Sequence, residues 1–218
     1  VRDRVVIASK VGMIDKDGNQ DFSVKHIRES LEGSLKRLRT EYIDLYQLHS
    51  PASDLANLDE VLSQLDGLRV VGKIKASGVS LRSVEDGIPL ITKYGLKCIQ
   101  VNLNLVDQRA AESGLLELCG KQQVGVIART PLSFGFLTGG YSAESAFDTL
   151  DHRRKWSPAQ LKKWAEAGRH FAHLVAEDRE QTPAQFALRF CISRDSVSTV
   201  IPGMLTRGHV EENSAASD

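Results

Sequence analysis

The sequence predicts a protein of the α/β class and, within that class, a (β/α)8 TIM barrel of which the 218 residues supply about six βα units. Short, nearly continuous apolar runs alternate with longer stretches of helical periodicity, which is typical of a parallel sheet covered by helices. Polar residues recur where the strands are expected to end. A barrel gathers such ends at one mouth, whereas an open sheet spreads them apart, so the barrel is favoured.

The first half of the chain is predicted to hold four strands separated by helices. Ser23 is the expected N-cap of the first helix, whose apolar stripe begins at Val24 and ends at Leu38. The second helix carries a comparable stripe from Leu55 to Leu68. The expected strands are residues 4–9, 43–48, 74–79 and 98–102, and a third helix covers about 83–94.

The second half continues the alternation with one interruption, a glycine-rich loop from Thr130 to about Trp156. Two helices after it share one entry signal, Ser157-Pro158 and Thr182-Pro183, in which an N-cap residue precedes a proline at the first helical position. The remaining expected elements are a helix over 111–122, a strand over 124–128, a strand over 198–201 and a helix that begins near Thr206.

Six strands cannot close a ring of eight, and their open edges would be long and apolar. We therefore expect about two further βα units outside the 218 residues. They are expected upstream of Val1, because the chain opens directly into a strand and without a methionine. Residues 1–218 then form a single barrel domain that is incomplete at its N-terminus.

The composition argues against several classes of function. Lys plus Arg equals Asp plus Glu at 28 each, so the chain lacks the cationic excess that holds a protein to nucleic acid or to an anionic membrane. No apolar run approaches the roughly 20 residues of a membrane span, and the charged opening does not fit a signal peptide. Widely spaced Cys98, Cys119 and Cys191 suit reduced core thiols rather than disulfides or a metal cluster. We expect a cytoplasmic protein with a small-molecule partner, no metal, no nucleic acid and no membrane.

Four predicted strands end in residues that can do chemistry. Lys10 could form a Schiff base or lower the pKa of a neighbouring acid, or it could simply reach solvent. His49 could donate to a carbonyl oxygen of a substrate, or it could be structural. Ser80 and Gln100 together could hold a planar amide such as a nicotinamide carboxamide, the alternative being ordinary turn and strand polarity.

Two later segments could bind phosphate. Residues 129–140 carry three glycines after a strand, which permits close approach of the backbone to a ligand, although a long mobile loop is the alternative. Residues 201–203 follow the last strand, where barrels commonly bind phosphate, although a solvated helix start is the alternative. The polar groups that follow this second segment are Arg207, His209, Glu212 and Asn213.

In order and spacing these segments resemble the aldo-keto reductases, over residues 4 to about 216. The resemblance implies a (β/α)8 barrel that reduces an aldehyde or ketone, or oxidises the alcohol, by hydride transfer with NADP, NAD being possible. The matching segments are I-A-S-K-V-G, Y-I-D-L-Y-Q-L-H, G-K-I-K-A-S-G-V-S, Q-V-N-L, P-L-S-F-G-F-L-T-G-G-Y, and V-I-P-G with the later E-E-N.

The resemblance also implies roles for single residues. Lys10 looks like the catalytic lysine and His49 like the histidine that polarises the substrate carbonyl, while the catalytic aspartate and tyrosine would lie upstream. Tyr46 is a poor replacement because it should face the helices, and Tyr42 is a poor one because it precedes its strand. The implied cofactor ligands are Ser80 and Gln100 at the carboxamide, Arg129 at the nicotinamide ring, Thr130, Pro131, Leu132, Gly135 and Leu137 at the pyrophosphate, and Glu212 and Asn213 at the adenine.

The sequence departs from the family in places that bear on the cofactor. Leu81 replaces an asparagine that often follows the carboxamide serine. Gly203-Met204 stands where many NADPH-specific members have Lys-Ser to grip the 2′-phosphate, which leaves Arg207 or His209 as substitutes. Two other functions stay open, a non-catalytic NADP-binding module of the channel β-subunit type and an aldolase that uses Lys10 as Schiff base. In the loop of about 139–156, Phe147 and Trp156 suit either an apolar or ring-shaped substrate or the anchoring of the loop itself.

Overall fold

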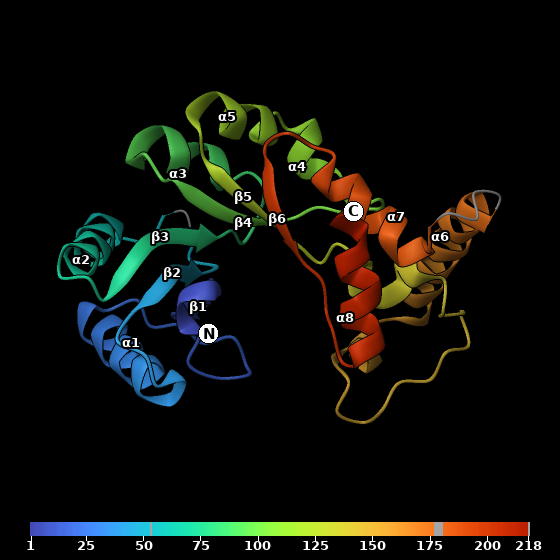
Figure 1. Ribbon diagram of the computed structural model, residues 1–218, viewed down its shortest axis with the longest axis horizontal. Helices are drawn as coiled ribbons and strands as arrows, with labels where there is room; N and C mark the ends of the chain where they lie inside the picture. The colour runs from blue at the N-terminus through green and yellow to red at the C-terminus, as the bar shows by residue number, and fades with distance from the viewer. Residues whose placement is uncertain (53, 177–180, 218) are drawn as a thin grey trace. The chain divides into compact units, whose positions relative to one another are not determined.

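A computed structural model describes residues 1–52, 54–176 and 181–217 and has the alternating α/β arrangement that the sequence predicts (Figure 1). Six strands form one sheet in chain order, β1-β2-β3-β4-β5-β6, and the strand pairs from β1 to β4 are parallel. The chain separates into two compact units. The first unit is residues 1–101 with 113–126, and the second unit is residues 102–112 with 127 onward.

Helices cover the strands of the first unit, and their N-caps are local. Ser23 Oγ accepts a hydrogen bond of 3.2 Å from the His26 amide, which confirms the predicted start of α1. Tyr46 on β2 is fully buried on the helical side, and its hydroxyl donates to the Ile27 carbonyl at 3.5 Å. The elements of this unit are β1 (Ala8–Val11), α1 (Val24–Leu38), β2 (Ile43–His49), α2 (Leu58–Val70), β3 (Ile74–Ser80), α3 (Gly87–Tyr94), β4 (Cys98–Asn102) and α5 (Leu115–Gln122).

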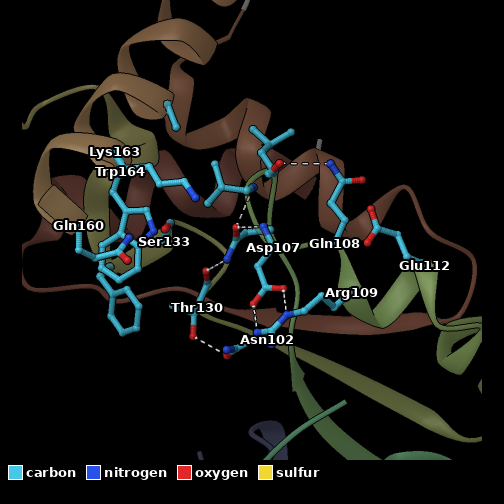
Figure 2. A pocket seen from close by; sticks show the side chains of 15 residues that line it. Asn102, Asp107, Gln108, Arg109, Glu112, Thr130, Ser133, Gln160, Lys163 and Trp164 are labelled. Atoms are coloured by element: carbon cyan, nitrogen blue, oxygen red, sulfur yellow. Dashed lines mark hydrogen bonds and ion pairs between the residues drawn. The ribbon is translucent and has the colours of Figure 1, made fainter. Parts of the chain in front are cut away.

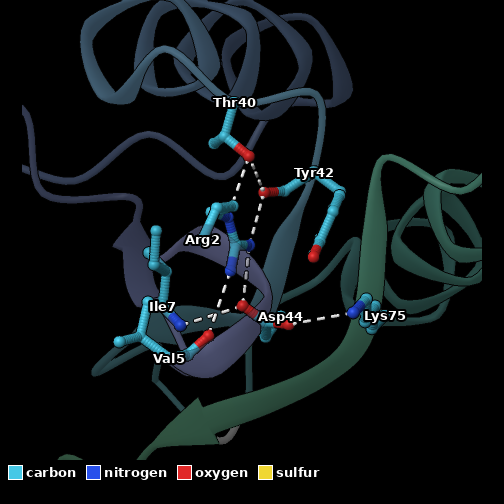
Figure 3. A network of polar contacts seen from close by, with 7 residues as sticks. All are labelled: Arg2, Val5, Ile7, Thr40, Tyr42, Asp44 and Lys75. Atoms are coloured by element: carbon cyan, nitrogen blue, oxygen red, sulfur yellow. Dashed lines mark hydrogen bonds and ion pairs between the residues drawn. The ribbon is translucent and has the colours of Figure 1, made fainter.

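The first strand begins later than predicted. Residues 4–9 were expected to form it, but β1 is Ala8–Val11, a 3-10 helix occupies Arg2–Arg4, and the side chains of Val5 and Val6 are exposed. The cause is a polar network around Asp44 (Figure 3). Arg2 donates to Asp44 Oδ2 at 2.7 Å and to the Val5 carbonyl at 3.1 Å. These bonds turn the chain before Ile7, so the apolar pattern of Val5 and Val6 does not continue into the sheet.

Asp44 is the centre of this network and stays ionised to low pH. Its Oδ2 also accepts from the Ile7 amide at 2.9 Å, and its Oδ1 lies 3.3 Å from Lys75 Nζ. Burial alone would raise the pKa of Asp44, but the hydrogen bonds from Ile7, Arg2 and Lys75 outweigh burial and lower it. The carboxylate thus ties the segment before β1 to β2 and β3 at their amino ends.

Among the residues that the structure describes, the second unit is built on the loop after β5 and on four α-helices. Thr182 and Gln185 form a capping box at the start of α7, and Thr206 Oγ1 accepts from the His209 amide at the start of α8, which confirms both predicted starts. Ser157 Oγ accepts from the Gln160 amide at 3.2 Å before α6. The elements of this unit include α4 (Arg109–Glu112), the 3-10 helices η2 (Ser133–Thr138) and η3 (His152–Lys155), α6 (Pro158–Ala176), α7 (Pro183–Ile192), β6 (Val197–Ile201) and α8 (Arg207–Ser214), while β5 (Gly125–Arg129) leads into it.

One predicted helix is divided. The sequence favoured a single helix over residues 111–122, but α4 ends at Glu112 and α5 begins at Leu115. Gly114 between them has a φ of +78°, in the left-handed region that glycine adopts most readily. The prediction of one continuous helix was wrong because it passed over this glycine.

The three cysteines are free thiols. Burial raises the pKa of Cys98 to about 11, of Cys119 to about 11 and of Cys191 to about 12. They therefore stay protonated at neutral pH, as expected of core thiols. Within the described ranges, no helix is both long and apolar enough to span a membrane, and no group of three or more His, Cys, Asp or Glu side chains could hold a metal ion.

Candidate active site

The carboxyl ends of β1 to β4 bring together the four strand-end residues that the sequence singled out. His49 on β2 lies opposite Ser80 on β3, which in turn lies opposite Gln100 on β4. Lys10 on β1 lies opposite Gln47, two residues before His49. Partners in a parallel register, and residues two apart on one strand, point to the same face of a sheet. All five side chains therefore belong to one face of the first unit.

The centre of this face is buried and polar. The side chains of Gln47, Ser80 and Gln100 are 1%, 1% and 4% exposed. Gln47 Nε2 donates to Gln100 Oε1 at 3.4 Å. Ser80 Oγ and Gln47 Oε1 have no hydrogen-bond partner among the described residues. Since nearly all buried polar atoms in proteins are hydrogen-bonded, an unsatisfied hydroxyl beside a buried amide suits a ligand that supplies both a donor and an acceptor, such as a carboxamide.

The turn after His49 is held by cross-links that the sequence analysis missed. Gln20 Nε2 donates to the His49 carbonyl at 2.8 Å and to the Ser50 carbonyl at 3.1 Å, and Gln20 Oε1 accepts from Arg82 at 3.0 Å. Ser50 has a φ of +57°, and its amide donates to the Ser80 carbonyl at 2.8 Å. A non-glycine residue in the left-handed region of φ is strained, so these hydrogen bonds hold the turn in place. They thereby fix the position of His49 at the end of β2.

Neither Tyr42 nor Tyr46 lies where a proton donor would be needed. Burial raises the pKa of Tyr46, which is on the helical side of β2. The Tyr42 ring lies between Arg2 and Lys75, each 4.1 Å from the ring centre. This contact is at the amino end of β2, opposite the end that carries His49.

The second unit contains a cavity of about 530 Å³ beside the loop after β5. Its walls also come from the segment after β6 and from α8. The sequence-predicted cofactor residues that line it are Thr130, Pro131, Leu132, Gly135, Gly203, Glu212 and Asn213.

Three other residues that were predicted from the sequence as cofactor ligands do not line this cavity. Leu137 is 1% exposed and belongs to the apolar core of the second unit. Arg207 is exposed at the start of α8, and its Nε donates to Glu211 at 2.7 Å. Arg129 is partly buried at the end of β5, and burial lowers its pKa.

Donor groups face the cavity from α8. Asn213 is 8% exposed, and its Nδ2 has no hydrogen-bond partner in the described part of the chain. His209 Nδ1 accepts from the Leu205 amide at 3.2 Å, so the neutral ring carries its proton on Nε2. An unsatisfied buried amide and an imidazole donor fit a ligand rich in acceptors, as the phosphates and adenosine of a dinucleotide are.

Arg153 also lines the cavity and was not predicted. Its guanidinium binds both oxygens of Asp151 at 2.6 to 3.1 Å and donates to the Phe134 carbonyl at 2.9 Å. It lies 4.8 Å from the Tyr141 ring centre and 4.4 Å from that of Phe147. Hydrogen bonds from Arg153 lower the pKa of Asp151 to about 2. The pair fastens the segment of residues 141–156 to the loop after β5.

Aromatic packing reinforces this attachment. Trp156 makes edge contacts with Phe134 at 4.7 Å and with Trp164 at 4.5 Å between ring centres, and Phe147 packs 5.6 Å from Tyr141. Of the two interpretations left open for Phe147 and Trp156, these contacts favour anchoring of the loop.

A second cavity of the second unit, about 690 Å³, lies beside the turn after β4 (Figure 2). Asn104 accepts from the Val106 and Asp107 amides and donates to the Thr130 carbonyl at 3.0 Å. Thr130 Oγ1 donates to Asn102 Oδ1 at 3.0 Å, and Thr130 has a φ of +58°. The polar side chains here thus hold Thr130, which belongs to both cavity walls, in a strained conformation.

The carboxyl ends of the parallel strands thus place Lys10 and His49 on the same face as Ser80 and Gln100. The sequence pattern of the Aldo/keto reductase family matches residues 1–218, and the chain belongs to this family. The resemblance seen in the sequence is thereby confirmed, and with it a fold that forms part of a (β/α)8 barrel.

The relatives support the same family. The chain is 30% identical over 224 residues to L-glyceraldehyde 3-phosphate reductase of Escherichia coli (strain K12), over 97% of this chain and 64% of that protein. It is 30% identical over 230 residues to L-galactose dehydrogenase of Arabidopsis thaliana, over 99% of this chain and 64% of that protein. The chain therefore spans just under two thirds of the length of these curated relatives.

Solved structures show the same fold. The holo form of aldo-keto reductase AKR11C1 from Bacillus halodurans matches with a TM-score of 0.75 and 25% identity, covering 100% of this chain and 68% of that one. Glycerol dehydrogenase AKR11B4 from Gluconobacter oxydans matches with a TM-score of 0.74 and 27% identity, covering 98% of this chain and 72% of that one.

Proposed function

We propose that the protein is an oxidoreductase that reduces an aldehyde or ketone, or oxidises the alcohol, with NADP as the hydride carrier. The observation that carries the proposal is the polar face of β1 to β4, where Lys10 and His49 share one side of the sheet with an unsatisfied, buried Ser80. Family membership supports the same reaction class. We propose a small carbonyl compound as substrate and the cytoplasm as location.

The residues present fit the cofactor. In the first unit, Ser80 and Gln100 would hold the nicotinamide carboxamide, because a hydroxyl and an amide match its donor and acceptor. In the second unit, the loop from Thr130 would hold phosphate, while Glu212 and Asn213 would hold the adenine end. When bound, the nicotinamide supplies or accepts the hydride.

His49 and Lys10 would act on the substrate and its proton. A donor aimed at the carbonyl oxygen stabilises the negative charge that develops there, worth roughly 3 to 4 kcal/mol for comparable donors, and His49 is proposed for this role. An unperturbed phenol, with a pKa of about 10, is too weak an acid at neutral pH. Lys10 is proposed to lower the pKa of the tyrosine that the family resemblance assigns as proton donor, through its positive charge.

The preference between NADP and NAD depends on the 2′-phosphate. Arg207 already pairs with Glu211 and is exposed, whereas His209 lines the cavity and has a ring N–H donor to offer. His209 is therefore our candidate for the 2′-phosphate ligand, and NADP is the proposed cofactor, with NAD as the alternative.

Turnover by the full-length protein tests the proposal. Consumption of NADPH and of NADH would be followed by absorbance with sugars, small aldehydes, ketones and quinones as substrates. We expect Lys10→Met and His49→Ala each to lower kcat by about 10² to 10³ while cofactor binding is kept. Lys25→Met, a change of an exposed lysine on α1, is the matched control and should leave kcat unchanged.

Two outcomes would support other functions. Tight NADP binding without turnover of any carbonyl would indicate a nucleotide-binding module. Borohydride trapping of a substrate on Lys10 would indicate an aldolase that works through a Schiff base.

A further inference from the structure

Two buried glutamines reach each other across an intervening strand. Gln47 lies on β2 and Gln100 on β4, with β3 between them. Neighbouring strands are about 4.8 Å apart, so the two backbones are separated by roughly 10 Å, a gap that only long side chains can bridge. Gln47 Nε2 nevertheless donates to Gln100 Oε1 at 3.4 Å.

The middle strand leaves room for this contact. The residue opposite Gln47 on β3 is Gly78, which has no side chain on the shared face. A Cβ added at Gly78 would lie 2.7 Å from the Cys98 carbonyl oxygen, so even alanine would force β3 and β4 apart. The glycine thus keeps the strands close and the face between the two amides open.

The burial of two amide side chains, Gln47 and Gln100, in the centre of this face requires a physical explanation. Burying a polar side chain costs free energy unless its atoms are hydrogen-bonded, and an apolar side chain would fill the same volume without that cost. Here Gln47 Oε1 and the neighbouring Ser80 Oγ have no partner within the described ranges. A merely structural pair would leave this cost uncompensated, whereas a ligand at Ser80 and Gln100 would offset part of it.

We infer that Gln47 is a positioning residue that sets which end of the Gln100 amide faces the nicotinamide carboxamide; this inference rests on the proposed function. The two ends of a glutamine amide have nearly the same shape but opposite hydrogen-bonding character, so the neighbours decide its orientation. Gln47 donates to Gln100 Oε1, which leaves Gln100 Nε2 as the group offered to the ligand. Gln100 then donates to the carboxamide oxygen, and Ser80 Oγ accepts from the carboxamide nitrogen.

A pair of dinucleotides can report this orientation. NADP⁺ carries a carboxamide, whereas its 3-acetylpyridine analogue keeps the carbonyl acceptor but has a methyl group in place of the NH₂ donor. For the wild-type full-length protein, the analogue loses only the bond to Ser80. We expect its Kd, measured by calorimetry, to exceed that of NADP⁺ by about tenfold or less.

The decisive variant is Gln47→Glu, measured at about pH 9.5, above the pKa of about 8 to 9 to which burial can raise a glutamate. Lys10, opposite residue 47 in the register, favours the ionised form further. A carboxylate only accepts hydrogen bonds, so it repels Gln100 Oε1 and turns the Gln100 amide around. The comparison is made in a Ser80→Ala background, because the Ser80 hydroxyl could otherwise donate to the oxygen of an acetyl group that has turned. In this background the carboxamide of NADP⁺ can turn and donate its NH₂ to Gln100 Oε1, whereas the acetyl analogue has no donor to offer. The ratio of the two Kd values should therefore rise at least about tenfold above that of Ser80→Ala alone.

Two further variants separate orientation from packing and charge. In the same Ser80→Ala background, Gln47→Met has a similar volume and no hydrogen bond, and it should leave the ratio within about threefold of that of Ser80→Ala alone. Gln122→Glu places the same charge at an exposed position of α5 and should not change the ratio. Because the ratio is taken within one variant, a smaller folded fraction cancels from it.

The outcomes are distinguishable. In the Ser80→Ala background, a Gln47→Glu ratio equal to that of Ser80→Ala alone and of Gln47→Met, with both probes bound, would overturn the positioning role and leave the proposed function standing. Failure of the wild-type protein to bind either probe would instead overturn the proposed function. A selective rise of the ratio in Gln47→Glu would support the inference.

Discussion

Gly168 in α6 is a helical glycine at which alanine should destabilise the protein. A Cβ at this position would overlap the Phe136 carbonyl oxygen and lie 2.9 Å from its carbonyl carbon, which are backbone atoms of η2. Alanine normally stabilises a helix interior by about 0.5 to 1 kcal/mol relative to glycine. Overpacking costs about 1 to 3 kcal/mol, and a clash with backbone belongs at the upper end of that range. We therefore expect Gly168→Ala to lower the free energy of unfolding by about 2 kcal/mol.

Gly67 in α2 provides the matched control. It is an exposed helical glycine whose added Cβ would meet nothing within 4 Å. Gly67→Ala should therefore raise the free energy of unfolding by about 0.5 to 1 kcal/mol. The same substitution in two helices is thus expected to have opposite signs.

Urea denaturation would measure both effects. Both tryptophans, Trp156 and Trp164, belong to the aromatic cluster around Phe134 and Phe136, so their fluorescence reports unfolding next to Gly168. Far-UV circular dichroism would follow Gly67→Ala. A Gly168→Ala protein as stable as the wild type, or more stable, would refute the close approach of α6 to η2.

Three further predictions concern the second unit. Thr182→Ala removes the capping box of α7 and should cost about 1 kcal/mol in urea denaturation, whereas Thr182→Ser should cost much less. The pKa of Asp151 falls from 3.8 to about 2 beside Arg153, so this pair should stabilise the fold above pH 4 and lose that effect as the pH falls toward 2. In Asp151→Asn, the free energy of unfolding should therefore fall less between pH 4 and pH 2 than it does in the wild type. An unchanged pH dependence in this range would count against the ion pair. Asn213→Asp replaces an unsatisfied donor by an acceptor and should raise the Kd for NADP⁺ by roughly tenfold in calorimetry, whereas an unchanged Kd would remove Asn213 from the proposed site.

Features that depend on neighbours in the chain could be predicted from the sequence. The N-caps at Ser23, Thr182 and Thr206 each accept from an amide three residues later, so the signal lies within one helical turn. The shared face of His49 and Ser80 follows from strand alternation once the strands are in register. Secondary structure and the sheet edge were accessible for this reason.

Features that depend on distant residues could not. The late start of β1 is set by Arg2 reaching Asp44, and nothing in the apolar run of Val5 and Val6 signals that contact. Strand alternation puts Gln47 on the same face as His49, but its contact with Gln100, a partner two strands away, cannot be seen in the sequence. Arg153 likewise lies in the cavity wall because it donates to the Phe134 carbonyl, 19 residues earlier in the chain, a contact that exists only in the folded protein.

A crystal structure of the full-length protein with NADP⁺ tests the central claim most directly. The account predicts the nicotinamide carboxamide within about 3 Å of Ser80 Oγ and Gln100 Nε2, on the face that carries Lys10 and His49. A nicotinamide bound away from that face, with Ser80 and Gln100 contacting no ligand, would contradict it.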